Sequence, residues 1–415
     1  MQNDPHFLCH INYRLSDFGE KWPEFTVGGS KYCDLGFFEA MHLKRISRAP
    51  IALIVSMGLL AAACGNDLDT TTERAEIVEE GGTPSRILGE PIPDTPVDFD
   101  GIPDRDSSII ELSDVFFDTF DGGSIPLDEA SDSDIERLLD SIPPIDNPAY
   151  IDPDTDPWLD DQDLILGYVA EDGQAYAYPH KILNFHEIVN DTLAGVPVLI
   201  SYCPLCNSGV VFDRRLDDLR QDGELTFSNT SALFDNDMVM VDRQTSSYWW
   251  QVPGRSIVGS LSGAELTVLP STTTSWGRWR FDNPETVIIT RDLGFSRDYS
   301  RDPFVGYAER LNNGGSTPFP VNADALADQR LLPATRVIGL EAGGEAAAVP
   351  IESLSSEIEF EIGGQTFAVV PDFAEGANAF LVDEDGNRSP APSRSTFWFA
   401  YVASFPDAQI FAPGQ

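Results

Sequence analysis

Short stretches in which apolar and polar residues alternate dominate the second half of the sequence, and they predict β-strands. These stretches are rich in β-branched residues and are bounded by Gly, Asp or Asn, as half-buried strands are. We expect strands at residues 196–202, 209–212, 225–227, 238–241 and 256–258. Helical spacing is confined to two short segments, residues 179–185 and 275–281. The sequence therefore predicts a β-rich α+β fold.

Two blocks of sequence recur in the same order, which indicates an internal duplication. Residues 165–179 and 337–350 both have the pattern of a hairpin that ends in a proline. The second block is an aromatic pair followed by a proline at matching spacing: Trp276, Trp279 and Pro284 in one copy, and Trp398, Tyr401 and Pro406 in the other. We expect two divergent internal repeats, residues 161–310 and 335–415, that pack as one domain.

A basic, then apolar, then small-residue segment precedes this body. Residues 41–48 include three basic side chains, residues 49–63 are apolar, and Cys64 follows three alanines. This order is typical of a secretory signal, and the apolar run is too short to span a bilayer. Ala61-Ala62-Ala63-Cys64 resembles the lipobox of bacterial lipoproteins; an ordinary signal peptide or an uncleaved anchor is the alternative. We expect a lipid on Cys64 and a location on the extracytoplasmic face of the cell envelope.

The segments around this signal have distinct compositions. Residues 1–40 show no targeting pattern, so we expect translation to start at Met41. Residues 64–106 are acidic and poor in large apolar side chains, which predicts a disordered N-terminal tether. Residues 107–160 mix short apolar stretches with Pro and Asp, which predicts an extension packed on the body.

The chain is strongly acidic, with a formal net charge of −42. Lys181 is the only lysine after Lys44. Nucleic acid is excluded as a partner, because phosphate binding requires clustered cations. The ordinary interpretation is a solvated, repulsive surface. The membrane, through the lipid on Cys64, is the one partner that the sequence predicts.

Two cysteines, Cys203 and Cys206, lie in the motif Tyr-Cys-Pro-Leu-Cys-Asn, and no other cysteine follows Cys64. Attachment of a c-type haem requires a histidine directly after the second cysteine, and Asn207 stands there, so this cofactor is excluded. A thioredoxin-like motif opens a helix, whereas residues 207–213 predict a turn and a strand. The motif therefore favours a site on a turn between strands.

A predicted hairpin brings a histidine towards this motif. Residues 186–191 and 196–202 have the pattern of two strands joined by a tight turn. Antiparallel pairing places His186 opposite Tyr202, to within one residue, and so close to Cys203.

His186, Cys203 and Cys206 together supply three ligands suited to one copper or zinc ion. A structural disulfide and a thiol-based redox or nucleophilic centre are the alternatives. Polar residues that could support the site are Glu187, Asn190, Asp191, Asp213, Arg214, Asp242 and Arg243. We expect most of these to be structural, because Asp-Arg pairs at strand ends commonly form ion pairs.

Several of these motifs together resemble a bacterial family called domain of unknown function 3179. They are Tyr-Pro at 178–179, Asn-Phe-His-Glu-Ile-Val-Asn-Asp at 184–191, Tyr-Cys-Pro-Leu-Cys at 202–206, Phe-Asp-Arg at 212–214 and Val-Asp-Arg at 241–243. The resemblance covers roughly residues 146–412; the family pattern has Trp where Phe185 stands and Phe-Gly where Phe227-Ser228 stands.

The resemblance implies an exported, often lipid-anchored protein whose cysteines and histidine form one site, and it implies no reaction. Two hypotheses follow from the sequence. One is a metal-binding or redox protein centred on Cys203, Cys206 and His186. The other is a non-enzymatic surface binding or structural module in which the two cysteines form a disulfide.

Overall fold

The computed structural model describes residues 87–88, 99–216, 223–372 and 376–414. They belong to one compact unit, residues 77–415. The predicted start at Met41, the signal at residues 41–63 and the lipid site Cys64 lie outside the described residues. Within them, no helix has the length and apolar character needed to cross a membrane.

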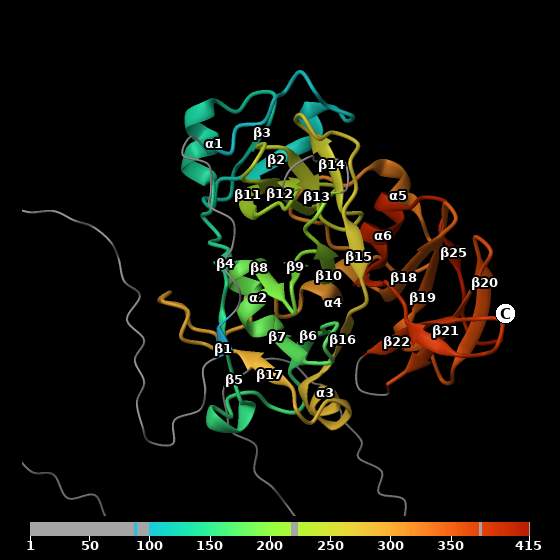
Figure 1. Cartoon of the computed structure of the whole chain (residues 1–415). Coiled ribbons are helices and arrows are strands. Elements are labelled where there is room, and N and C mark those ends of the chain that lie inside the picture. Colours follow the sequence, from blue (N-terminus) through green and yellow to red (C-terminus); the bar gives the residue numbers. More distant parts are fainter. Residues whose placement is uncertain (1–86, 89–98, 217–222, 373–375, 415) are drawn as a thin grey trace, which may run out of the picture. The chain divides into compact units, whose positions relative to one another are not determined.

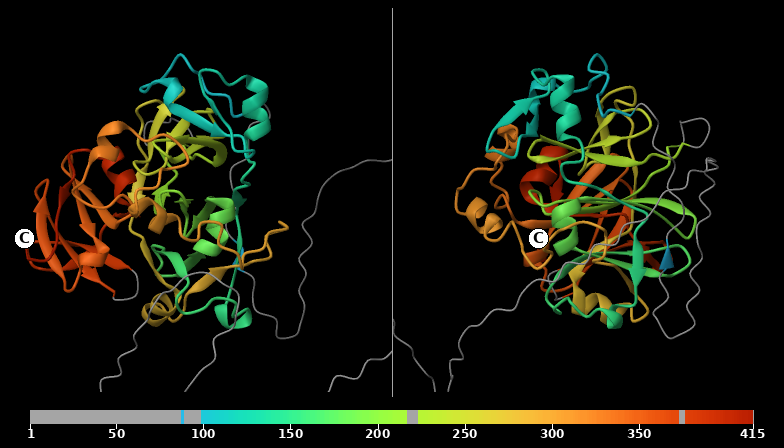
Figure 2. Two further views of the ribbon diagram at one scale, coloured as in Figure 1. Left: turned by 180° about the vertical axis from the view of Figure 1, so that it is seen from behind. Right: turned by 90° about the vertical axis from the view of Figure 1, so that its left-hand side faces the viewer.

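The central sheet contains nine strands and joins the middle of the chain to its C-terminal part, so its colours run from green to red in Figures 1 and 2. Its order is β25 (Gln409–Ile410), β19 (Glu345–Pro350), β18 (Arg336–Ala342), β24 (Arg394–Phe397), β10 (Ser208–Asp213), β9 (Val196–Cys203), β8 (Ile188–Leu193) and β4 (Ile145–Asp146), and β15 (Thr267–Leu269) pairs with β10. Every residue of β8 and β9 is buried. Their two-residue turn has positive φ at Ala194 and Gly195, as a tight hairpin requires.

Two six-stranded sheets and one four-stranded sheet complete the β-structure. One six-stranded sheet has the order β1 (Ile87–Leu88), β5 (Ala149–Ile151), β17 (Val287–Ile289), β7 (Ala175–Pro179), β6 (Leu164–Val169) and β16 (Thr272–Ser275). The other has the order β14 (Arg255–Val258), β13 (Tyr248–Trp250), β12 (Asp237–Asp242), β11 (Phe227–Phe234), β2 (Val115–Asp118) and β3 (Ser124–Pro126). The four-stranded sheet has the order β20 (Ile358–Ile362), β21 (Gln365–Pro371), β22 (Ala377–Val382) and β23 (Arg388–Pro390).

Helices are few and short. The α-helices are α1 (Asp132–Leu138), α2 (His180–His186), α3 (Trp276–Asp282), α4 (Tyr307–Asn312), α5 (Ala323–Ala327) and α6 (Trp398–Ser404), and the 3-10 helices are η1 (Leu112–Asp114), η2 (Pro153–Thr155) and η3 (Ile351–Ser353). Helix α2 begins after Pro179, because proline cannot donate within a helix but is tolerated at its start. It ends where Glu187 adopts a positive φ of 59°.

The β-rich character predicted from the sequence is confirmed, and both predicted helices occur, each displaced by one residue. The strand expected at residues 225–227 is wrong, because β11 begins at Phe227 and continues through polar residues to Phe234. Those polar side chains are satisfied inside the protein: Thr230 Oγ1 donates to the carbonyl oxygen of Val239, and Ser231 Oγ donates to that of Leu138. Because both faces of β11 are buried, apolar and polar residues do not alternate along it, and this alternation was the pattern on which the prediction rested.

The predicted tether is too long at its C-terminal end. Phe99 and Ile102 pack against a buried cluster that includes Val115 and Leu138. Tyr248 also donates a hydrogen bond to the carbonyl oxygen of Gly101, over 3.1 Å. Residues 99–106 therefore belong to the folded body.

Two hairpins, β6–β7 and β18–β19, have the same surroundings. The first strand of each hairpin pairs on its other side with an antiparallel strand that leads into a helix. For β6 this neighbour is β16, which leads into α3, and for β18 it is β24, which leads into α6. The second strand of each hairpin also pairs in parallel with a later strand, β7 with β17 and β19 with β25. A Cβ atom at Gly167 would collide with the ring of Trp279, and one at Gly339 would collide with the ring of Tyr401. The close approach of helix and strand therefore requires glycine in both hairpins.

Candidate functional site

The Cys-Pro-Leu-Cys motif forms the tight connection between β9 and β10. Cys203 is the last residue of β9, and Ser208 is the first of β10. The backbone N–H of Cys206 donates to the carbonyl oxygen of Cys203 over 3.2 Å, and that of Asn207 donates to Pro204 over 3.3 Å. The second cysteine thus leads into a strand, as the sequence predicts, and the motif has the form of a turn instead of a helix start.

A second hairpin brings a carboxylate to this turn. Asp235 and Asn236 connect β11 to β12, and both have positive φ, as the two central residues of a type I′ turn do. The carbonyl oxygen of Asn236 accepts a hydrogen bond from the Cys206 thiol, with a donor–acceptor distance of 3.2 Å. The turn therefore fixes Asp237, the first residue of β12, beside the cysteines.

Cys203, Cys206 and Asp237 form one buried cluster. One ligand atom from each residue, Sγ or a carboxylate oxygen, lies within 4.8 Å of the other two. Both cysteines are free thiols. The carboxylate of Asp237 accepts backbone hydrogen bonds from Met238 and Val252, over 2.9 and 2.8 Å. Its position is therefore fixed by the backbone, and the two thiols beside it are not joined in a disulfide.

Burial determines the protonation of this cluster. It raises the pKa of Asp237 to about 7, against the lowering effect of the hydrogen bonds from Val252 and the two thiols. Burial also raises the pKa of Cys203, and it raises that of Cys206 well above the usual range. None of the largest causes of these three shifts is a basic residue of the described chain. A bound cation would stabilise the charged forms that burial disfavours.

His186, the predicted third ligand, lies elsewhere. Its Nδ1 is 2.8 Å from the carbonyl oxygen of Pro143, and its Nε2 is 2.7 Å from the hydroxyl oxygen of Tyr299. Both ring nitrogens therefore have partners, and the structure does not bring this imidazole into the cluster of the two thiols. His186 is the last residue of α2 and does not belong to β8.

Glu187 occupies the position that the hairpin prediction gave to His186. Its carbonyl oxygen accepts the backbone N–H of Tyr202 over 2.7 Å, so the predicted register is correct to within its margin of one residue. A shift of one residue exchanges the two faces of a strand. The residue that faces the cysteines is accordingly a carboxylic acid, and the imidazole is directed to other partners.

Glu187 and Cys203 line the same cavity, whose volume is about 210 Å³. Asn229 Nδ2 donates to Glu187 Oε2 over 2.8 Å. Burial raises the pKa of Glu187 to about 8. A β-bulge between Asn229 and Ala232 of β11 adjoins the cavity, and bulges commonly redirect side chains beside functional sites.

The remaining predicted site residues hold the fold together. Asn190 pairs with both backbone groups of Phe227. Asp191 accepts a hydrogen bond from Tyr150, and burial raises its pKa to about 6. Arg214 is fully buried and donates to backbone carbonyls.

The other three act in the same way. Asp213 forms an ion pair with Arg215. Asp242 accepts hydrogen bonds from the indole of Trp249 and from Thr245. Arg243 forms an ion pair with Asp146, whose side chain is 36% exposed. These contacts agree with the structural role that we expected for most of these residues.

The sequence analysis missed Asp237, Asn229 and Asn236. A signal was present for the first and last, because the pair Asp235-Asn236 between two apolar runs is typical of a two-residue hairpin turn. Nothing in the sequence distinguishes Asn229 from the other polar residues of β11.

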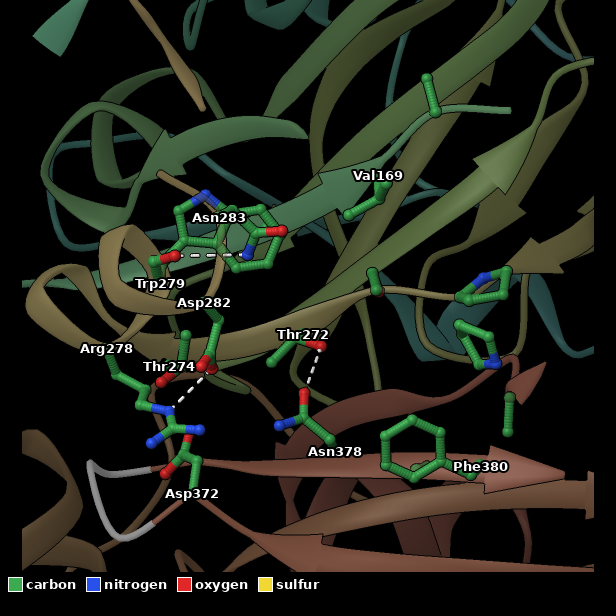
Figure 3. A pocket seen from close by; sticks show the side chains of 17 residues that line it. Val169, Thr272, Thr274, Arg278, Trp279, Asp282, Asn283, Asp372, Asn378 and Phe380 are labelled. Atoms are coloured by element: carbon green, nitrogen blue, oxygen red, sulfur yellow. Dashed lines mark hydrogen bonds and ion pairs between the residues drawn. The ribbon is translucent and has the colours of Figure 1, made fainter. Parts of the chain in front are cut away.

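A larger cavity of about 410 Å³ lies between α3, β16 and β22 (Figure 3). Two pairs of its polar side chains bond to each other. Arg278 and Asp282 form an ion pair at 2.7 Å, and Thr272 Oγ1 donates to Asn378 Oδ1 over 2.9 Å. No cysteine or histidine lines it among the described residues. The thiol cluster and its smaller cavity are the stronger candidate, because they combine several metal ligands with unbalanced acidic groups.

The fold and the site define a β-rich protein with a buried dithiol–carboxylate cluster beside a small cavity. The model of a family described as protein of unknown function (DUF3179) matches residues 139–408. The chain belongs to this family, which confirms the resemblance that its motifs indicated. No curated protein and no solved structure matches the sequence.

Proposed function

We propose that the protein binds one zinc ion through Cys203, Cys206 and Asp237. The observation that carries the proposal is the buried cluster of two thiols and one carboxylate, with ligand atoms within 4.8 Å of one another. In a tetrahedral zinc site the ligand atoms are about 3.5–4 Å apart, given bond lengths near 2.0–2.3 Å. Small side-chain movements are therefore enough to close the site around the ion.

The ligand set favours zinc over copper. Thiolates and a carboxylate are all common zinc ligands, whereas Cu(I) prefers sulfur alone. A divalent ion with two thiolates and one carboxylate also leaves a single net negative charge in the buried site. Copper has the higher affinity for many mixed sites, so copper uptake at the same residues is the second candidate.

Three protein ligands leave a fourth coordination position for an exchangeable ligand. Cys203 lines the cavity of about 210 Å³, so a molecule in that cavity has access to the ion. A structural zinc site normally has four protein ligands. The proposed site is therefore suited to transfer or catalysis, and the cavity contains a further acid, Glu187, close to that position.

Metal analysis of the full-length protein, purified under reducing conditions and loaded with zinc, tests this proposal. We expect about one zinc per chain in the parent, and loss of nearly all of it in Cys206→Ser and Asp237→Asn, because each variant removes one ligand. His186→Gln is the matched control and should keep the metal, since His186 contacts Pro143 and Tyr299 instead of the cluster.

Two results would contradict the proposal. One is a parent that takes up neither zinc nor copper after reduction, with Cys203 and Cys206 joined in a disulfide before it. The other is loss of zinc in His186→Gln but not in Asp237→Asn, which would restore the ligand set predicted from the sequence.

We also propose that Cys64 anchors the protein by a lipid to the extracytoplasmic face of the cell envelope. The basic, apolar and small-residue segments before Cys64 support this proposal. Cys64→Ser should move most of the protein from the membrane fraction to the soluble fraction, and fractionation followed by immunoblotting measures this. Ser47→Ala is the control, because it leaves the cysteine intact. Membrane retention of Cys64→Ser would contradict the lipid anchor.

A further inference from the structure

The cavity beside Cys203 has aromatic and aliphatic walls. Three phenyl rings line it, from Phe120, Phe304 and Phe319. Its aliphatic lining residues are Ile142, Leu205, Ala232, Leu233, Met238 and Pro318. Such walls favour a ligand with a largely apolar surface.

The ionisable side chains of this cavity include only acids. Asp118 and Glu187 line it, and Asp237 lies behind Cys203 in the thiol cluster. No Lys, Arg or His lines it among the described residues. Anionic ligands are therefore disfavoured, because their charge would approach carboxyl groups with no basic residue to compensate it.

Two of the three rings are held by hydrogen bonds of their own backbone. The carboxylate of Asp118 accepts the N–H of Phe120 over 2.7 Å. The side-chain oxygen of Asn236 accepts the N–H of Phe319 over 3.1 Å. The same Asn236 accepts the Cys206 thiol through its carbonyl oxygen. Phe319 is thus tied to the β11–β12 turn that contacts Cys206, and Phe120 is tied to the end of β2.

We propose that this cavity binds a small organic ammonium ion. Alkylated ammonium groups have an apolar surface and a positive charge, and proteins recognise them with aromatic rings and carboxylates. A cavity of roughly 150 Å³ holds a benzene molecule. The volume of about 210 Å³ is therefore sufficient for an ion of the size of choline.

This inference does not depend on the metal, because the rings and the acids of the cavity are in place without an ion. A zinc ion with two thiolates and one carboxylate would keep the neighbouring site negative. The ammonium ligand and the metal are therefore compatible.

Calorimetric titration of the metal-free, reduced full-length protein with choline tests the inference. The matched ligand is 3,3-dimethylbutan-1-ol, which has nearly the shape of choline but carries no charge. We expect choline to bind at least about tenfold more tightly than this alcohol, because only the cation interacts with the ring faces and with the carboxylate of Asp118. Equal binding of the two ligands, or binding of neither, would overturn the inference.

Variants locate the ligand. Phe120→Leu should weaken choline binding about tenfold, and its fold is not at risk because Phe120 is 53% exposed. Phe281→Leu is the control, since Phe281 is 79% exposed and lies on α3, outside the cavity. Unchanged affinity in Phe120→Leu would place the ligand elsewhere and refute the cavity. Cys206→Ser should lose zinc but keep choline, so failure of the metal proposal and failure of this one give different results.

Discussion

Glu187→Gln is expected to abolish much of the decline in stability that the parent protein shows as the pH rises from about 5 to about 8. Burial raises the pKa of Glu187 to about 8 in the folded protein, from a usual value of 4.5. The expected decline in the parent is on the order of a few kcal/mol, because each unit of difference in pKa corresponds to about 1.4 kcal/mol. Chemical denaturation of both proteins at several pH values, metal-free and reduced, measures it.

The sign follows from the protons that each state binds. Between the unfolded and folded pKa values, the folded protein keeps the proton on Glu187, whereas the unfolded chain has released it. The contribution of this group is therefore fully present below about pH 4.5, and it is lost as the pH rises towards about 8. The raised pKa values of Asp237, about 7, and Asp191, about 6, add declines of the same sign.

Glutamine resembles the protonated acid in shape and can still accept the hydrogen bond from Asn229, so the variant should fold. The control is Glu285→Gln, because Glu285 is exposed and this substitution should leave the pH dependence as it is in the parent. Equal slopes of stability against pH in the parent and in Glu187→Gln would contradict the assignment.

The sequence was most informative where a local pattern determines structure. The two-residue turn at Ala194-Gly195 sets the β8–β9 hairpin, and the β-branched and apolar residues on both sides of it indicate the two strands. The strand after Cys206 likewise follows from the residues of 208–213 themselves. These features require no knowledge of distant parts of the chain.

The third member of the thiol cluster could not be found in this way. Asp237 reaches Cys203 and Cys206 because the β11–β12 hairpin packs its turn against the β9–β10 connection, which is a tertiary contact. The register of the β8–β9 hairpin likewise decided the roles of His186 and Glu187. An uncertainty of one residue is small for a fold prediction, but it decides which of two side chains faces the cavity.

The internal duplication stays a prediction, and the packing of Gly167 on Trp279 and of Gly339 on Tyr401 agrees with it. These two contacts explain why the matching sequence blocks consist of a hairpin and a distant aromatic pair. The aromatic residue of the helix fills the space that glycine leaves on the strand. Comparison of the repeated blocks within the chain finds both the hairpin and the aromatic residue of each contact. The sequence alone does not show that the two touch.

Arg214→Lys is expected to lower the free energy of unfolding by about 2–3 kcal/mol, because a buried carbonyl group left without its hydrogen bond costs about 1–3 kcal/mol. Arg214 is fully buried, and a structural role was expected for most residues of the Asp-Arg motifs at strand ends. Its guanidinium donates to the carbonyl oxygens of Val198 and Asp191, over 3.0 and 2.9 Å, and forms an ion pair with Glu224 at 2.9 Å.

The planar fork of the guanidinium is what this substitution removes. A lysine ammonium is a single point donor and cannot reach acceptors on β8, β9 and Glu224 together, so buried carbonyl groups lose their partners. Arg215→Lys is the matched control. Its side chain is 52% exposed and pairs with Asp213, so the change should cost less than about 1 kcal/mol. Urea denaturation of both variants measures the difference. Equal stability of Arg214→Lys and Arg215→Lys would mean that the hydrogen bonds of Arg214 do not hold β8 against β9. The hairpin beside Glu187 and Cys203 would then depend on its backbone pairing alone.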